Sequence, residues 1–179
     1  MRKLIGVAGR ARSGKDTFVL GLIKLGYTRG AFADALKQVT ALVANEPLHN
    51  FTTDELKEGY SEALGMTRRK ALQNVGKGMR DILRDDIWIQ RLLSTWAAAG
   101  EIPFAISDVR YPNEARLIRE RGGIVVNIER PGVGGLSGEA ALHESERPLP
   151  PELVDFTIVN DGTVEDLHRW AATIAQEAA

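Results

Sequence analysis

The stretch Gly9-Arg10-Ala11-Arg12-Ser13-Gly14-Lys15-Asp16-Thr17 decides the fold. The apolar run at residues 4–8 precedes it and predicts a buried strand, and Phe18, Leu22 and Leu25 follow it at helical spacing. A glycine-rich turn between a strand and a helix aims backbone N–H groups, the positive helix end and a lysine at one point. The stretch therefore predicts a phosphate-binding loop.

The loop departs from the commonest phosphate-loop pattern at one position. Gly9, Gly14 and Lys15 fit G-x-x-x-x-G-K-[S/T], but Asp16 stands where a hydroxyl is usual, and Thr17 comes one residue later. We expect Lys15 to bind the β and γ phosphates, Asp16 to help place Mg²⁺, and Thr17 to contact the α phosphate. The alternative is a glycine-rich turn with a surface lysine, which the flanking strand and helix disfavour.

Strand-like and helix-like segments alternate along the rest of the chain. Strands are predicted at residues 27–33, 102–106, 124–128 and 156–159, and helices at 34–44, from 53, at 67–83, 86–99, 112–121 and 164–177, with Asp34 as an N-cap. This order predicts an α/β fold with a doubly wound parallel sheet. Residues 131–151 are rich in Pro and Gly, which indicates a mobile excursion within a single domain.

Composition excludes several classes of protein. The net charge is −1, so a general affinity for nucleic acid or anionic membranes is not expected. The sequence contains no cysteine, which excludes disulfides and thiol chemistry and fits a cytoplasmic setting. No apolar run approaches the roughly 18 residues of a membrane span, and the apolar run at the N-terminus is too short for a signal peptide.

Three further residues are candidates for phosphate chemistry. Asp108 follows the strand predicted at 102–106, and ligands of open α/β sheets bind beyond the carboxyl ends of the strands, so it could reach Mg²⁺. Its alternative role is an N-cap for the helix near Pro112. Arg130 and Arg147 border the excursion at 131–151 and could close over transferring phosphates, although Arg147 could equally be a solvated loop residue.

The helix predicted at 67–83 has a polar stripe beside its apolar one. The stripe consists of Arg69, Gln73, Lys77, Arg80 and Arg84. Arg69 could bind a phosphate and Gln73 a base edge, whereas Lys77 and Arg84 are expected to be solvated.

Taken together, these motifs resemble the phage-type deoxynucleoside monophosphate kinases, within the P-loop nucleoside monophosphate kinase superfamily. The likeness lies in residues 7–17, in Phe32-Ala33-Asp34-Ala35-Leu36-Lys37, in residues 69–76 and 86–88, in Ser107-Asp108-Val109-Arg110-Tyr111-Pro112-Asn113-Glu114, and in residues 130–131, 143–146 and 160–163. In that family Asp-Thr after the lysine is normal. The first motif and the one around Asp108 are specific, and the others support them.

The resemblance implies transfer of the γ phosphate of ATP to a deoxynucleoside monophosphate with Mg²⁺, catalysed by Lys15, Arg130 and Arg147. It implies an ATP site at Gly9, Arg12, Ser13, Gly14, Lys15, Asp16, Thr17, Asn160, Gly162 and Thr163, with residues 160–163 near the adenine. It implies an acceptor site at Asp34, Lys37, Arg69, Gln73, Asp108 and Arg110, and a metal site at Asp16, Thr17 and Asp108. It further implies five parallel strands in three layers, a helical acceptor-binding insert at roughly 45–84, a lid at roughly 131–151, and a homodimer.

Two other functions remain open at this point. One is a kinase similar to dephospho-coenzyme A kinase, which shares the core, although the block at residues 107–114 speaks against it. The other is a non-catalytic module that binds ATP as a regulatory signal. The sequence leaves the accepted base open.

Overall fold

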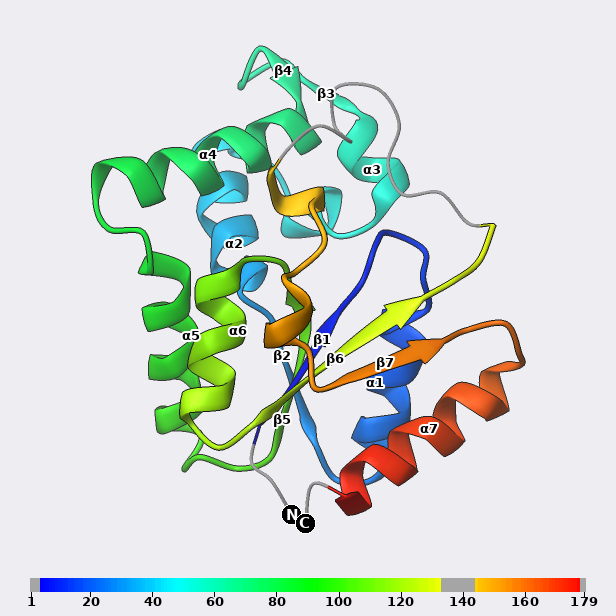
Figure 1. The fold of residues 1–179 in the computed structure, drawn as a ribbon. Coiled ribbons are helices and arrows are strands. Elements are labelled where there is room, and N and C mark those ends of the chain that lie inside the picture. Colours follow the sequence, from blue (N-terminus) through cyan, green and yellow to red (C-terminus); the bar gives the residue numbers. More distant parts are fainter. Residues whose placement is uncertain (1–3, 133–143, 178–179) are drawn as a thin grey trace. The chain divides into compact units, whose positions relative to one another are not determined.

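The computed structural model describes residues 4–132 and 144–177. Its central feature is a five-stranded sheet in the order β2 (Thr28–Gly30), β5 (Phe104–Val109), β1 (Leu4–Ala8), β6 (Ile124–Glu129) and β7 (Phe156–Val159). Every pair of neighbouring strands is parallel (Figure 1). The predicted parallel sheet is therefore confirmed, and β1, which leads into the glycine-rich loop, lies at its centre.

Helices cover both faces of this sheet. Ile5 and Val7 of β1 are fully buried in one apolar cluster with residues of α1 (Lys15–Lys24) and α7 (Val164–Glu177). Gly6 faces the opposite side, because successive side chains of a strand alternate. A Cβ at Gly6 would lie 2.5 Å from Ile118 Cδ1 of α6 (Pro112–Glu120), so this close approach of helix and strand needs a glycine. The arrangement is the three-layer α/β fold.

The chain divides into two compact units, one formed by the residues up to Ala31 and from Leu93 onward, and one formed by Phe32–Leu92. The second unit contains α2 (Ala33–Ala44), a 3-10 helix at Leu48–Phe51, α3 (Asp54–Glu58), β3 (Tyr60–Ser61), β4 (Met66–Thr67), α4 (Arg68–Ile82) and the start of α5 (Ile87–Ala98). Phe51 is fully buried at its core with Ala41 and Ala44. The predicted insert at 45–84 falls within this unit.

Several predicted boundaries need correction. The helix predicted from Asp34 already begins at Ala33, with Phe32 at the N-cap position, so Asp34 is not the cap but lies in the first turn. The strand predicted at 27–33 is reduced to Thr28–Gly30. The hairpin of β3 and β4 was not predicted, because two-residue strands are too short to give a periodic pattern.

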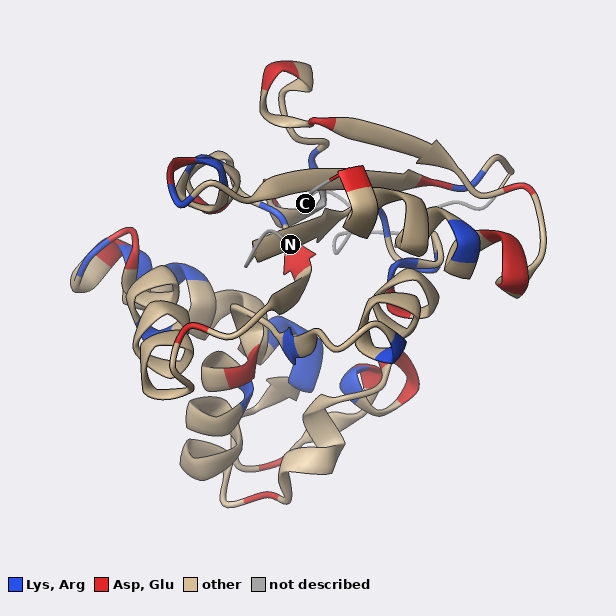
Figure 2. Ribbon diagram, turned by 90° about the horizontal axis from the view of Figure 1, so that it is seen from below, with Lys and Arg blue, Asp and Glu red and all other residues tan. Residues whose placement is uncertain are grey.

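The excursion at 131–151 is only partly described. Residues 133–143 lie outside the described residues, and the remainder contains two 3-10 helices at Glu144–Glu146 and Pro151–Leu153. Positively and negatively charged residues both occur on the helices, between longer runs of other residues (Figure 2). Within the described ranges, every helix is too short or too polar to span a membrane.

Candidate active site

The glycine-rich loop joins β1 to α1, and its two glycines have backbone conformations that other residues rarely adopt. Gly9 has φ +136° and Gly14 has φ +104°. A Cβ on Gly9 would lie 2.4 Å from the carbonyl oxygen of Ile128, and one on Gly14 would lie 2.4 Å from Asn160 Nδ2. The sequence therefore needs glycine at both positions for the loop to pack between β6 and the turn after β7.

The polar groups of the loop face one another. Lys15 is the first residue of α1, and its Nζ donates a hydrogen bond of 2.6 Å to the carbonyl oxygen of Arg10. Ser13 is 3% exposed, and its buried hydroxyl has no hydrogen-bond partner in the part of the chain that the structure describes. A buried hydroxyl without a partner is costly unless a ligand completes it, so this atom points to an anion bound in the loop.

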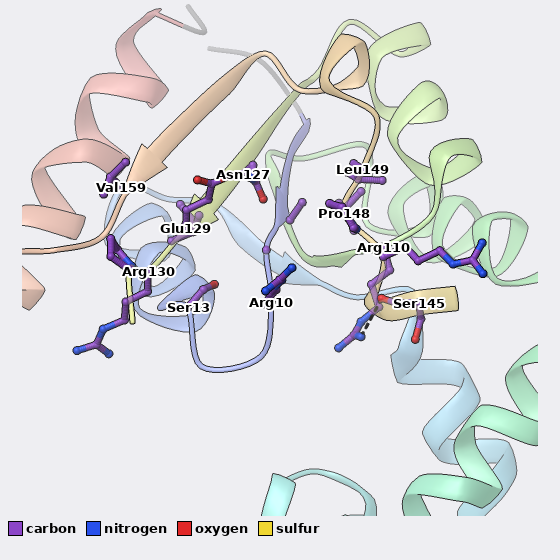
Figure 3. A pocket seen from close by; sticks show the side chains of 16 residues that line it. Arg10, Ser13, Arg110, Asn127, Glu129, Arg130, Ser145, Pro148, Leu149 and Val159 are labelled. Carbon is purple, nitrogen blue, oxygen red and sulfur yellow. Dashed lines mark hydrogen bonds between the residues drawn. The ribbon is translucent and has the colours of Figure 1, made fainter. Parts of the chain in front are cut away.

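A cavity of about 370 Å³ opens beside the loop, at the carboxyl ends of four strands. The ends of β1, β5, β6 and β7 contribute Ala8, Val109, Glu129 and Val159 to its lining. Four arginines also line it, namely Arg10, Arg110, Arg130 and Arg147 (Figure 3). This is the edge at which open α/β sheets bind ligands, and the guanidinium groups favour a phosphate-bearing one.

Arg130 and Arg147 were predicted to lie near phosphates, and both line this cavity. Arg130 follows the last residue of β6, and Arg147 follows the 3-10 helix at Glu144–Glu146. Both loop arginines are exposed, and Arg10 lines the cavity whereas Arg12, with φ +64°, does not. The predicted contact of Arg12 with ATP stays a prediction. The position of Arg10 two residues after the carboxyl end of β1 was the signal that could have identified it.

Arg110 is held by contacts on both sides. Its Nη1 donates to the carbonyl oxygen of Ser145 at 3.3 Å, which Figure 3 marks with a dashed line. The N–H groups of Arg110 and Tyr111 both donate to Glu114 Oε2, at 2.8 and 3.0 Å. Glu114 is 1% exposed, so a buried carboxylate fixes the turn from which Arg110 extends. Sequence reasoning did not assign Glu114 this role.

Asp108 lies within β5, which extends to Val109, and not beyond a strand ending at Ile106 as predicted. The alternative role of Asp108 as an N-cap is wrong, because Tyr111 occupies the N-cap position of α6. Asp108 is half-buried near the carboxyl end of β5, next to the cavity-lining residues Val109 and Arg110.

The predicted metal ligands offer hard oxygen donors. Asp16 and Thr17 lie in the first turn of α1, and Asp108 lies near the end of β5. Among residues 4–132 and 144–177, no group of three or more Asp, Glu, His or Cys side chains forms a metal cage. Mg²⁺ bound with a nucleotide usually takes only one or two carboxylates besides phosphate and water, so this donor set fits such an ion.

The turn after β7 packs against the glycine-rich loop. Asn160 is 7% exposed, and its Nδ2 donates to the carbonyl oxygen of Ser13 at 2.8 Å. Thr163 and Asp166 cap α7 reciprocally, since Thr163 N donates to Asp166 Oδ2 and Asp166 N donates to Thr163 Oγ1, at 2.8 and 3.2 Å. A Cβ at Gly162 would lie 2.5 Å from Asp166 Oδ2, so this capped turn needs glycine there. The predicted contacts of these residues with ATP stay predictions.

In the second unit, three largely buried cations come from three helices. Lys37, Lys57 and Arg69 belong to α2, α3 and α4, and their side chains are 18, 17 and 13% exposed. We call these residues the cation cluster. Arg69 donates to Glu58, and Arg69 and Lys57 contact Asp54 Oδ1 at 3.1 and 3.5 Å. Lys37 lies 3.8 Å from Asp34. The cluster contains the predicted residues Lys37 and Arg69, and the predicted Asp34 lies beside Lys37.

Lys57 is the member of the cation cluster that sequence reasoning missed. Burial lowers the pKa of Lys57 from its ordinary value of 10.5, the charge of Asp54 raises it in part, and the charges of Lys37 and Arg69 lower it further. A lysine whose pKa is shifted by burial and by specific charged neighbours is a candidate for a functional site. Nothing in its local sequence separates it from a solvated helical lysine.

The remaining residues of the polar stripe include Gln73, Lys77 and Arg84, and the predicted base contact of Gln73 stays a prediction. Gln73 is half-buried one turn beyond Arg69. Lys77 and Arg84 are each 55% exposed and pair with Asp81 and Asp86. Arg84 lies beyond the end of α4 at Ile82. The prediction that these two cations are solvated is confirmed.

Comparison with known proteins identifies the family. The family model described as "Deoxynucleotide monophosphate kinase" matches residues 66–170, which is more than half of the 179 residues. The chain belongs to this family. A protein of Acanthamoeba polyphaga mimivirus, assigned by inference as a deoxynucleotide monophosphate kinase, is 33% identical over 98% of this chain and 97% of its own length. The resemblance stated from the motifs is therefore confirmed.

Solved structures confirm the fold. Dephospho-CoA kinase from Campylobacter jejuni is 18% identical with a TM-score of 0.52, and protein TT1252 from Thermus thermophilus is 21% identical with a TM-score of 0.53. Each alignment covers 99% of this chain and 98% of the other. At these identities the likeness concerns the fold alone. Fold and family together make the chain a kinase, that is, a phosphotransferase.

Proposed function

We propose that this chain transfers the γ phosphate of ATP to a deoxynucleoside 5′-monophosphate, giving a deoxynucleoside diphosphate and ADP. The observation that best supports the proposal is the cavity lined by Arg10, Arg110, Arg130 and Arg147 beside a phosphate-binding loop. Phosphoryl transfer depends mostly on positioning the reactants and on stabilising negative charge, and arginines around such a loop supply both.

The glycine-rich loop would bind the donor. Its N–H groups and the amino end of α1 attract the β and γ phosphates, and Lys15 already lies at the loop through its bond with Arg10. The buried Ser13 hydroxyl, which has no partner among the described residues, would donate to a phosphate oxygen. Gly162 and Thr163 would lie on the nucleoside side of the donor, as the resemblance implies, while Asn160 contacts the loop itself.

The reaction needs no general base. An oxygen of the acceptor phosphate, already ionised at neutral pH, forms the new bond to the γ phosphorus, and the bond between that phosphorus and the β–γ bridging oxygen breaks as ADP leaves. Arg110, Arg130 and Arg147 would stabilise the charge on the transferring oxygens. Mg²⁺, held with the donor by Asp16, Thr17 and Asp108, would neutralise part of that charge when bound.

The cation cluster of Lys37, Lys57 and Arg69 would bind the 5′ phosphate of the acceptor. Three largely buried cations from three helices, each beside a carboxylate, offer a set of donors for a dianion. Gln73 follows Arg69 by one helical turn and would recognise the edge of the base, because its amide both donates and accepts. Asp34, which pairs with Lys37, would orient that lysine.

The decisive experiment measures ADP release from ATP with dAMP, dGMP, dCMP, dTMP and dUMP as acceptors, with the corresponding ribonucleotides and dephospho-coenzyme A alongside. We expect turnover with at least one deoxynucleotide. The variant Lys15→Ala should lose about 10²–10³-fold in kcat, while Lys24→Ala, at the other end of α1, should keep it.

ATP binding without ADP release for any acceptor would favour the regulatory module and contradict the proposal. Turnover with dephospho-coenzyme A alone would favour a kinase similar to dephospho-coenzyme A kinase. The family assignment does not favour that alternative, because the likeness to the solved structure of dephospho-CoA kinase concerns the fold alone.

A further inference from the structure

The peptide between Ser13 and Gly14 needs an external restraint. Gly14 has φ +104°, in a region where glycine moves freely, so the residue that permits the turn of the loop also permits this peptide to rotate. Gly14 is the N-cap of α1, and the structure gives it no side-chain cap. The loop's own sequence therefore leaves the orientation of this peptide undetermined.

Asn160 provides the restraint. Its Nδ2 donates a 2.8 Å hydrogen bond to the carbonyl oxygen of Ser13, and this contact joins residues 147 positions apart in the sequence. Asn160 is 7% exposed, and its own backbone N–H donates to the carbonyl oxygen of Glu129 at 2.7 Å. The backbone from which this side chain extends is thus fixed at the ends of β6 and β7.

The contact also determines where the next N–H points. A peptide is planar and trans, so the carbonyl of Ser13 and the N–H of Gly14 point in opposite directions. With the carbonyl held toward Asn160, the N–H of Gly14 points away from it. If the peptide rotated, it would replace an N–H donor with a carbonyl oxygen, which repels phosphate.

We propose that Asn160 is a positioning residue that locks the Ser13–Gly14 peptide in the orientation that binds the triphosphate of the donor. The inference rests on the proposed function, because ATP is the donor there. It assigns Asn160 a different role from the adenine contact that the resemblance implies. The side chain acts through the loop, so its effect concerns the phosphates and not the base.

The test compares three ligands: ATP, GTP and inorganic tripolyphosphate, which has no base. Their affinities are measured by calorimetry or competition for the wild-type protein, Asn160→Ala and Asn160→Asp. Aspartate preserves the volume of the side chain but cannot donate to the carbonyl of Ser13. The aspartate variant therefore tests the same hydrogen bond if the alanine variant is poorly folded. We expect both variants to bind ATP and tripolyphosphate about tenfold more weakly, or worse. The ratio of ATP to GTP affinity and the KM of the acceptor should stay unchanged.

Asp155→Ala is the matched control, because it removes a hydrogen bond at the opposite end of β7. Asp155 Oδ2 accepts from the N–H of Val125 at 2.8 Å and lies outside the loop. This variant should lose thermal stability but keep its affinity for tripolyphosphate.

Three results would count against the inference. A loss of ATP affinity with unchanged tripolyphosphate affinity would mean that Asn160 contacts the base. Wild-type affinities in both variants would overturn the inference but leave the proposed function standing. Wild-type protein that binds neither ATP nor tripolyphosphate would overturn the proposed function and the inference with it.

Discussion

At the scale of single residues, Gly14 combines two constraints that any side chain would violate. Its φ of +104° is unfavourable for an L-residue, and a Cβ would lie 2.4 Å from Asn160 Nδ2. We expect Gly14→Ala to lower the free energy of unfolding by about 1–3 kcal/mol and to abolish measurable ATP binding. Chemical denaturation and an ATP titration measure the two effects.

Gly26 allows the effect of the positive φ to be measured without the effect of a close contact. Its φ is +93°, but nothing lies within 4 Å of a Cβ placed there. Gly26→Ala should therefore show the backbone strain without any loss of ATP affinity. If both alanine variants bound ATP equally well, the close contact at Gly14 would be irrelevant to the loop.

Lys57 illustrates the opposite case, a residue whose charge costs stability. Its pKa is lowered, first by burial, so the native state binds its proton less tightly than the unfolded chain does. Asp54 would keep Arg69 as a partner at 3.1 Å if Lys57 were removed. We therefore expect Lys57→Met to raise the free energy of unfolding at neutral pH by about 0.5–1 kcal/mol and to raise the KM of the acceptor about tenfold.

The pH dependence gives a second measurement of the same residue. Between the lowered native pKa of Lys57 and 10.5, the unfolded state binds more protons than the native state does. The free energy of unfolding of the wild-type protein therefore rises with pH in this range, and the destabilisation caused by charged Lys57 at neutral pH disappears. Lys57→Met should lack this recovery, so the difference between the two proteins shrinks at alkaline pH. A constant difference from pH 7 to 10.5 would contradict the assigned pKa direction. Lys77→Met, which changes an exposed lysine on α4, is the control.

At the scale of elements, a side-chain cap marks the start of α4. Thr67 precedes α4, and its side chain accepts from the N–H of Lys70 at 3.3 Å. Because Arg69 lies in the first turn after this cap, we expect Thr67→Ala to lower the free energy of unfolding by about 1 kcal/mol and to raise the KM of the acceptor but not of ATP. Thr67→Ser should restore both, since it keeps the hydroxyl. An equal rise in both KM values would show a general loss of folded protein instead.

The elements also show how far the sequence predicts the structure. The strand before the glycine-rich loop and the helix after it were predictable, because apolar periodicity and glycine punctuation agree there. The end of β5 was not, because Ser107 and Asp108 interrupt the apolar run while the backbone still pairs with β1 as far as Val109. Asp34 follows a good N-cap pattern, but Phe32 is buried and helix α2 begins one residue earlier.

At the scale of the whole molecule, alternating strands and helices predicted the parallel sheet, while contacts between distant residues stayed hidden. The bond from Asn160 to Ser13 and the pairing of Arg69 with Asp54 and Glu58 depend on tertiary packing, which no local pattern encodes. Arg110 was found through a motif, but the buried Glu114 that fixes its turn was taken as part of the same motif without a role.

The division of the chain into two units leads to a final prediction. The predicted donor-binding residues lie in the first unit, whereas the cation cluster lies in the second. A ligand that binds only the native state slows local opening of the residues it contacts, by about a hundredfold at 100 times its Kd. In hydrogen exchange, a non-hydrolysable ATP analogue alone should protect residues 8–18, and the deoxynucleotide acceptor alone should protect residues 33–40 and 68–76. Lys15→Ala should remove the first protection and leave the second. Equal protection of all three segments by the ATP analogue alone would mean that the two units open together. That result would contradict the prediction that donor and acceptor bind to separate units.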